Sequence, residues 1–282
     1  MLQATPIIDF HTHSAPNGDM SPSFEAMMLD IMGSREKLDA HESHFANPEN
    51  FVEEIHSNGV DYAVVLAAYT PLNTGITSNE TVEEYCKNHK ELVPFCSFNP
   101  YMEPDMPAAL RAMHARGFKG IKLYPSYNHF YMNDAKMYPL YEVAQELAMP
   151  ILVHVGTSIF QNTRLKYCRP IDLDDVAVDF PDLNVLMAHG GRLAWFDEAM
   201  SVLRMHRNIF IELSGIPVKK LLTIFPDMPR FSHQFVFGTD WPQVKPSRSI
   251  AGIRSLGMSE EATARILGGN AARLLHLDVS AS

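Results

Sequence analysis

The chain has 282 residues, of which 46% are hydrophobic and 20% are charged, and its formal net charge is −10. This composition is ordinary for a globular protein and excludes a disordered chain. The acidic balance argues against nucleic acid as a partner because it repels phosphate, but it leaves an acidic small molecule open, since a few cations in one pocket decide the local field.

Eight short β-rich segments follow one another along the chain. Most are dense in Val, Ile, Leu and Phe rather than strictly alternating, which is typical of buried parallel strands. In chain order they are residues 7–10, 62–66, 93–97, 120–124, 151–155, 184–188, 209–213 and 235–238.

Amphipathic segments separate these strands. The clearest helices are predicted over residues 48–58, 79–89, 107–116, 138–147 and 193–206. Strands that alternate with helices indicate a parallel α/β sheet, and eight such units favour closure into a (β/α)8 TIM barrel. Because the sequence has no internal repeat and no linker, we expect one barrel domain over residues 1–282.

Two segments are longer than a simple barrel needs, and both follow strands. Residues 14–46 are rich in Met and His, and residues 156–170 carry Arg164, Lys166 and Arg169. Loops that follow barrel strands lie on the face where such enzymes bind substrate. Two interpretations of the Met-rich segment stay open, a lid over a site or a small helix packed on the barrel.

Polar residues able to bind a metal stand at the ends of four predicted strands. His11 and His13 end the first strand two residues apart, so that both side chains point the same way. His154 ends the fifth strand, His189 the sixth and Asp240 the eighth. In a parallel barrel these ends share one mouth, so a common site explains all five better than five separate structural roles do.

Imidazoles together with a carboxylate suit one divalent metal ion. Zinc is the first expectation and manganese also fits such a ligand set. A bound ion of this kind lowers the pKa of its water towards neutrality. His189 is either a further ligand or a base beside the ion, and the sequence leaves both open.

Several segments in order resemble the amidohydrolase superfamily, and within it the amidohydrolase-2 family. They are residues 8–13, 117–125, 150–156, 188–191, 238–242 and 269–275. The family includes aminocarboxymuconate-semialdehyde decarboxylase, γ-resorcylate decarboxylase, and related hydratases and lactonases. The histidine pair alone is a weak motif, whereas the ordered set spans nearly the whole chain.

This resemblance implies one metal ion bound by His11, His13, His154 and Asp240, with His189 and Asp240 as catalytic residues. The favoured reaction is hydrolysis, by metal-activated water, of a small lactone or amide that carries a carboxylate. The alternative is nonoxidative decarboxylation of an aromatic or unsaturated carboxylic acid. A third interpretation is a metal-binding barrel without catalysis.

Three further residues are predicted to bind the substrate. Lys122 ends the fourth strand, where it is either a cation that meets a substrate carboxylate or half of an internal salt bridge. Arg164 lies in the long loop after the fifth strand, and Trp241 follows Asp240. Arg164 is alternatively a surface charge, and Trp241 either stacks on a planar substrate or anchors its own loop.

The remaining expectations concern location and partners. The three cysteines are odd in number and far apart, which favours a reducing compartment. Residues 1–6 lack the features of a signal peptide and no apolar stretch is long enough to span a membrane, so the cytoplasm is expected. The resemblance also makes a homodimer plausible, and a small-molecule substrate is the expected partner.

Overall fold

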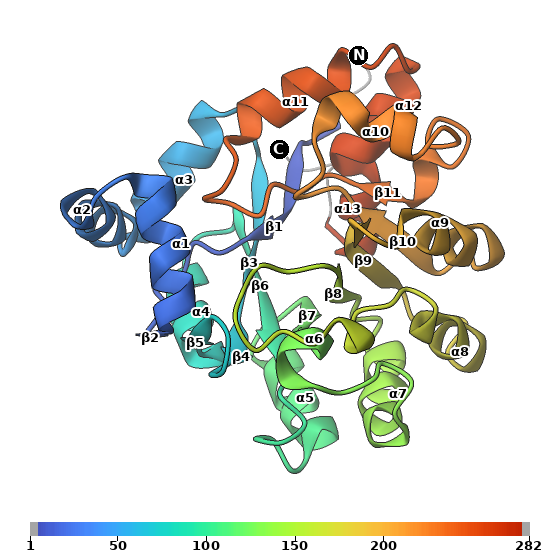
Figure 1. Ribbon diagram of the computed structural model, residues 1–282, viewed down its shortest axis with the longest axis horizontal. Coiled ribbons are helices and arrows are strands. Elements are labelled where there is room, and N and C mark those ends of the chain that lie inside the picture. Colours follow the sequence, from blue (N-terminus) through green and yellow to red (C-terminus); the bar gives the residue numbers. More distant parts are fainter. Residues whose placement is uncertain (1–4, 278–282) are drawn as a thin grey trace.

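Eight parallel strands stand at the centre of the computed structural model, which describes residues 5–277 (Figure 1). Their order in the sheet follows the chain, as expected for a (β/α)8 barrel. All eight predicted strands are confirmed, although the sixth runs four residues beyond its predicted end. The strands are β1 (Ile8–Thr12), β3 (Tyr62–Leu66), β6 (Leu92–Ser97), β7 (Gly120–Leu123), β8 (Ile151–Gly156), β9 (Val185–Arg192), β10 (Ile209–Glu212) and β11 (Phe235–Val236).

The last strand is short, and the chain beyond it brings the barrel close to closure. The amide of Phe10 donates to the carbonyl of Phe237 at 3.0 Å, and the amide of Asp240 donates to the carbonyl of His11 at 2.9 Å. The amide of His13 donates to the carbonyl of Trp241 at 3.0 Å. These bonds hold the segment that carries Asp240 against the end of β1.

Helices lie between the strands and cover the outside of the barrel (Figure 1). The five predicted helices are present, with ends that differ by up to three residues from the predictions. The structure also contains helices that the sequence did not predict. The helices around the barrel are α3 (Pro48–Ser57), α4 (Asn79–Cys86), α5 (Met106–Ala115), α6 (Pro125–Asn128), α7 (Tyr138–Glu146), α8 (Asp172–Asp179), α9 (Phe196–Met205), α10 (Leu221–Ile224), α11 (Pro246–Arg254), α12 (Glu260–Ala264) and α13 (Asn270–Leu274). Within residues 5–277 no helix has the length and apolar character that a membrane span requires.

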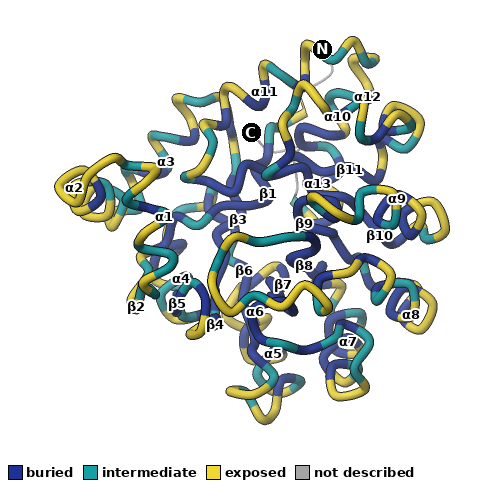
Figure 2. The backbone as a smooth tube through the Cα atoms, in the orientation of Figure 1, coloured by how far each residue is buried: buried dark blue, intermediate teal, exposed yellow. Residues whose placement is uncertain are grey.

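The strands are buried on both faces, as the dark central tubes of Figure 2 show. Alternate residues belong to two different apolar clusters: Val64 packs with Phe10 and Phe210, whereas Val65 packs with residues of the surrounding helices such as Phe51. This is the alternation of side chains expected along a strand. It also decides which polar residues at the strand ends face the barrel interior.

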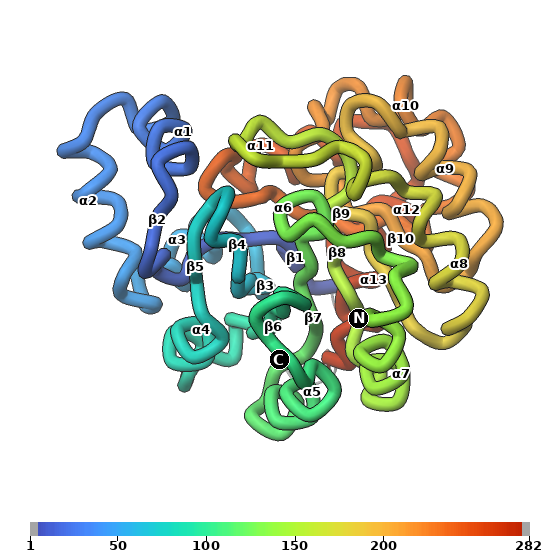
Figure 3. The backbone as a smooth tube through the Cα atoms, turned by 60° about the horizontal axis from the view of Figure 1, so that its bottom comes forward, coloured from blue at the N-terminus to red at the C-terminus, as the bar shows by residue number. Residues whose placement is uncertain are grey.

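Segments that follow β1, β3 and β8 form an additional layer on one side of the barrel (Figure 3). Residues 14–46 fold into β2 (Asp19–Met20), α1 (Pro22–Met32) and α2 (Arg35–Phe45). The chain after β3 forms a hairpin of β4 (Ala68–Thr70) and β5 (Gly75–Thr77), and β5 pairs with β2 in a three-stranded antiparallel sheet. The sequence did not predict this sheet, because strands of two or three residues are too short to show alternation.

The loop after β8, residues 156–170, joins this layer. The ring of Phe24 on α1 lies 5.8 Å from the ring of Phe160. The side-chain amide of Asn73 donates to the carbonyl of Gln161 at 2.6 Å, so the hairpin also contacts the loop. We call residues 14–46, 68–77 and 156–170 together the roof.

Candidate active site

A cavity of about 510 Å³ lies between the carboxyl ends of the strands and the roof. This volume is in the range of small-molecule sites. The polar residues at its base come from the strand ends or directly follow them, and we call them the floor: His11, His13, Lys122, His154, His189, Arg192 and Asp240. The roof contributes apolar and aromatic side chains, which include Met20, Phe24, Met27, Met28, Phe45 and Phe160.

The structure brings His11, His13 and Asp240 together at this floor. Oδ1 of Asp240 lies 3.2 Å from Nε2 of His13 and 3.4 Å from Nε2 of His11. One ligand atom from each of the three residues lies within 4.8 Å of the others, as a shared metal ion requires. Burial alone raises the pKa of the Asp240 carboxyl, but the neighbouring imidazoles of His11 and His13 bring it well below its usual range.

His154 lies on the adjacent part of the floor, with its ring 4.8 Å from that of His189. It is 3% exposed, and its Nε2 has no hydrogen-bond partner among the described residues. Leaving a buried polar atom without a partner costs free energy, so this nitrogen fits the role of a metal ligand. Together with His11, His13 and Asp240, it supplies a donor set that suits one divalent ion.

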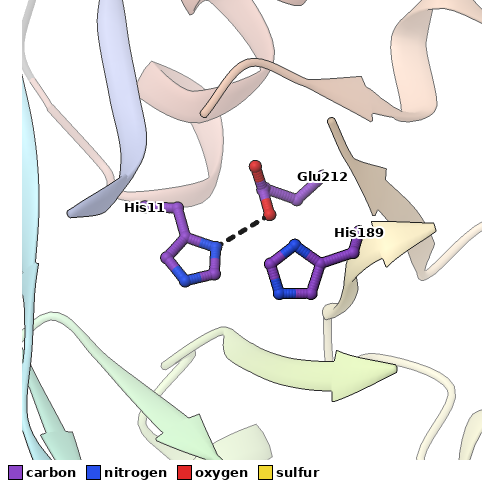
Figure 4. Close-up of side chains that lie close together, drawn as sticks. All are labelled: His11, His189 and Glu212. Atoms are coloured by element: carbon purple, nitrogen blue, oxygen red, sulfur yellow. Dashed lines mark hydrogen bonds and ion pairs between the residues drawn. The ribbon is translucent and has the colours of Figure 1, made fainter. Parts of the chain in front are cut away.

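Glu212 at the end of β10 orients His11 (Figure 4). Nδ1 of His11 lies 2.9 Å from Oε2 of Glu212, and Oε1 accepts a bond from the amide of Ser214 at 2.6 Å. Because a carboxylate accepts, the proton of His11 sits on Nδ1, and the lone pair of Nε2 faces the cavity. Burial raises the pKa of Glu212 to about 7, against the opposing effect of the bonds from Ser214.

His189 is oriented in a similar way by Ser214. Its Nδ1 donates to the backbone carbonyl of Ser214 at 3.1 Å and lies 3.0 Å from Oγ of the same residue. That hydroxyl donates to Glu212 at 2.8 Å. The proton of His189 is therefore on Nδ1, which leaves Nε2 as an acceptor. Burial lowers the pKa of His189 well below its usual value, and Arg192 adds to this effect, so the ring is neutral.

A second group of potential ligands consists of His11, His189 and Glu212 (Figure 4). Both Nδ1 atoms and the carboxylate already take part in the hydrogen bonds around Ser214. We therefore infer that these hydrogen bonds hold the two imidazole rings in place, and that Nε2 of His11 is the atom available to a metal ion. Glu212 and Ser214 therefore have a supporting role at the floor.

The backbone turns sharply at two of these residues. His189 has φ +66° and Asp240 has φ +56°, a left-handed conformation that is uncommon for residues other than glycine. Ala188 belongs to the apolar cluster inside the barrel, so an extended strand would direct His189 to the other face. Gly191 is required nearby, because its φ is +81° and a Cβ there would lie 2.5 Å from the carbonyl of Trp195. Strained backbone of this kind is concentrated at functional sites.

Lys122 lies completely buried at the floor. Its Nζ is 3.5 Å from Nε2 of His11, and no acid within residues 5–277 forms an ion pair with it. Burial lowers the pKa of Lys122 to about 8, although Asp240 and Glu212 act in the opposite direction. Of the two sequence interpretations, the internal salt bridge is absent from the described part of the chain, and the cation faces the cavity.

Trp241 lines the cavity but is only 5% exposed. The ring of His41 on α2 stacks on it at 5.3 Å, and the rings of Phe45 and Phe51 each lie 4.8 Å away. These contacts fit the anchoring role for Trp241 and leave substrate stacking as a prediction. His41 is half-buried and lines the cavity, whereas His44 is exposed.

Arg164 lies outside the cavity, whereas Arg192, for which the sequence analysis made no prediction, lies at its floor. Arg164 is exposed, and its backbone amide donates to the carbonyl of Ser126 at 3.0 Å. Arg192 ends β9 and lines the cavity. The sequence analysis did not single out Arg192, because the predicted strand ended at residue 188. The length of β9 is what brings this guanidinium to the floor.

Asp9 is a buried residue behind the floor that the sequence analysis did not single out. Its carboxylate accepts bonds from the amide of Thr239 at 3.0 Å and from the hydroxyl of Thr239 at 2.6 Å. The amide of His11 donates to it at 3.2 Å. Burial raises the pKa of Asp9 to about 7, against the effect of these bonds. Asp9 thus connects β1 to the segment that carries Asp240. The sequence feature that could have identified Asp9 is an acidic residue within an otherwise apolar strand.

Solved structures share this architecture. An uncharacterised TIM-barrel protein from Bordetella bronchiseptica has 21% identity and a TM-score of 0.80 over 96% of this chain and 98% of its own. A 2,6-dihydroxybenzoate decarboxylase from Rhizobium has 15% identity and a TM-score of 0.71 over 97% and 99%. A dihydroxybenzoic acid decarboxylase from Polaromonas, solved with manganese and the inhibitor 2-nitroresorcinol, has 14% identity and a TM-score of 0.70 over 97% and 98%. At such identities the likeness shows the fold.

Sequence comparison identifies the family. No curated protein matches the chain. A family model described as Amidohydrolase matches residues 8–277, which is nearly the whole chain and includes every floor residue. The chain belongs to the amidohydrolase family and is an enzyme of that family.

Proposed function

We propose that this enzyme is a metal-dependent nonoxidative decarboxylase of an aromatic or unsaturated carboxylic acid. One observation carries the proposal: the buried ammonium of Lys122 lies beside the metal-ligand set without an acid partner among residues 5–277. A buried cation of this kind favours a substrate that brings its own carboxylate. The aromatic rings of Tyr124, Tyr127 and Phe160 in the cavity wall suit a planar substrate.

The solved structures support the same choice. The Rhizobium and Polaromonas proteins are both named as decarboxylases of dihydroxybenzoic acids. A further similar structure is a 5-carboxyvanillate decarboxylase from Sphingomonas paucimobilis. Because fold alone does not determine chemistry, these names set the substrates to test and do not replace the test.

Each floor residue has a part in this reaction. His11, His13, His154 and Asp240 would hold one divalent ion, which supplies the positive charge that orients the acid. Lys122 would neutralise the reacting carboxylate. The bond between the carboxyl carbon and its neighbour breaks, carbon dioxide leaves, and that neighbour takes up a proton. His189 and Asp240 both line the cavity, and one of them would pass this proton from solvent to the carbon.

The identity of the ion belongs to the proposal. Three imidazole nitrogens and one carboxylate accept both zinc and manganese. The Polaromonas structure contains manganese. We expect zinc or manganese, and reconstitution of metal-free protein with each ion in turn will decide which supports turnover.

Hydrolysis of a lactone or amide is the second candidate, and one observation favours it. Both His189 and Asp240 are in their basic forms, because the pKa of each is lowered well below its usual value. A base beside a divalent ion suits removal of a proton from water. The same floor therefore serves this reaction if the substrate presents a carbonyl group.

A paired substrate panel separates the two candidates. Metal-loaded enzyme is incubated in D₂O with 2,6-dihydroxybenzoate and 5-carboxyvanillate, and separately with aliphatic and aromatic lactones and amides. The proposal expects carbon dioxide release and one deuterium at the carbon that lost the carboxylate. Ring opening of a lactone without carbon dioxide release from any acid would replace the proposal with the hydrolase.

A further inference from the structure

Arg192 places a second positive group in the cavity. It ends β9, three residues after His189, and lines the same cavity as the metal-ligand set. Its Nη2 donates to the carbonyl of Thr157 at 3.3 Å, which is a long bond. A guanidinium has five N–H donors, so most of its capacity is left for a ligand.

No acid of the described chain neutralises Arg192. Ion pairs with Asp or Glu hold Arg111, Arg169 and Arg204 on the surface, but none among residues 5–277 includes Arg192. The acids that line the cavity are Glu42 and Asp240, and Asp240 already contacts the imidazoles. A partly buried charge without a partner is costly, which favours a ligand that supplies the anion.

The fold makes room for this guanidinium. Gly215, with φ +68°, lies against it: a Cβ at this position would collide with Nη1 of Arg192 and would lie 3.2 Å from Nδ1 of His189. The guanidinium therefore sits near His189, whereas Lys122 sits at His11. The two cations therefore have different neighbours on the floor, and the rings of those neighbours lie 5.2 Å apart.

We propose that Arg192 binds a second carboxylate of the substrate, so that the natural substrate is a planar dicarboxylic acid. One carboxylate is directed to the metal and Lys122 and reacts, and the other is held by the planar fork of Arg192 and stays. This fork matches a carboxylate in a two-bond arrangement. The inference rests on the proposed decarboxylase function and names the class of acid that this function would use.

Binding measurements test the inference without turnover. Calorimetry on the metal-loaded enzyme compares isophthalate, which has two carboxylates, with benzoate and with 3-carbamoylbenzoate, which have one. We expect isophthalate to bind about tenfold or more tightly than either, as a charge-assisted pair implies. Equal affinity for all three, or tighter binding of inorganic phosphate than of isophthalate, would overturn the inference.

Matched variants assign this difference to Arg192. Arg192→Met should lower the affinity for isophthalate by about tenfold more than the affinity for benzoate, and Arg192→Lys should keep part of the preference for isophthalate. Arg164→Met is the control, because Arg164 is exposed and outside the cavity. An equal loss for both ligands in Arg192→Met would mean a structural role and would contradict the inference.

The ligand comparison in the unchanged enzyme stands even if Arg192→Met fails to fold. Failure of the proposed function gives a different result from failure of this inference. If the enzyme prefers isophthalate through Arg192 but decarboxylates no acid in the panel, the subsite holds and the reaction is wrong. If the enzyme decarboxylates monocarboxylic acids and shows no preference for isophthalate, the proposed reaction is correct and the proposed Arg192 subsite is wrong.

Discussion

The floor and the roof of the cavity are built in different ways. Floor residues such as His11 and Lys122 come from central strands and are at most 1% exposed. His11 is also held by buried bonds to Glu212 and Ser214. The roof consists of two helices, three short strands and the loop after β8, and Glu42 and His44 on α2 are exposed. The difference indicates that the barrel fixes the positions of the proposed metal ligands, whereas the roof shapes the cavity above them.

The largest effect is expected from loss of a floor ligand. His154→Ala should weaken metal binding by about 100-fold or more, because even residues that only orient a ligand contribute 10–100-fold. Metal analysis after dialysis, together with activity, measures this loss. His44→Ala in the roof is the matched control and should keep both. Full metal content in His154→Ala would remove this residue from the ligand set.

The next effect separates chemistry from metal binding within the floor. His189→Ala should retain the metal ion and lose about 10²–10⁴-fold in turnover, the usual contribution of an acid or base. Steady-state assays measure the turnover, and metal analysis of the same preparation measures the metal content. If His189→Ala loses the metal as completely as His154→Ala does, His189 is a ligand and its proposed proton transfer is wrong.

The sequence predicts the floor better than the roof, for a physical reason. Strands buried on both faces are dense in apolar residues, so their ends can be located, and parallel strands must present those ends at one mouth. This argument places His154 and His189 at the cavity. The argument fails for Arg192. In the sequence, the two glycines after His189 indicate the end of the strand, but β9 continues through a left-handed residue at His189 as far as Arg192.

The roof offers no comparable regularity. Its strands have two or three residues, and its helix α1 lies in a Met-rich segment that the sequence could assign either to a lid or to packing. The structure shows that both interpretations hold in part, since Met28 is buried and also lines the cavity. Contacts between loops far apart in sequence, such as Phe24 with Phe160, have no local signal.

A smaller effect is expected when the roof is altered. Phe24→Ala removes a partly buried ring that lines the cavity and contacts Phe160. Loss of about 1 kcal/mol of apolar contact corresponds to about a fivefold higher KM. Metal content and kcat should stay close to those of the unchanged enzyme. Loss of metal in Phe24→Ala would contradict the separation of floor from roof.

The smallest effect concerns the pH dependence of the roof. Burial lowers the pKa of His41 below its usual value, the neighbouring His44 adds to this, and Glu54 opposes it. A lowered pKa in the folded state means that the stacking of neutral His41 on Trp241 is fully present above the unfolded value of about 6.5. That contribution is lost as the pH falls through the lower folded value.

We therefore expect amide hydrogen exchange in α1 and α2 to become a few-fold faster, after correction for intrinsic rates, when the pH falls from about 7.5 to about 5.5. Amides of the central strand β8 should not change. His41→Phe keeps an aromatic ring against Trp241 but has no group that titrates, so its roof should exchange at the same corrected rate at both pH values. If His41→Phe shows the same acceleration as the unchanged enzyme, the titrating group lies elsewhere, and the stacking of His41 on Trp241 does not control the roof.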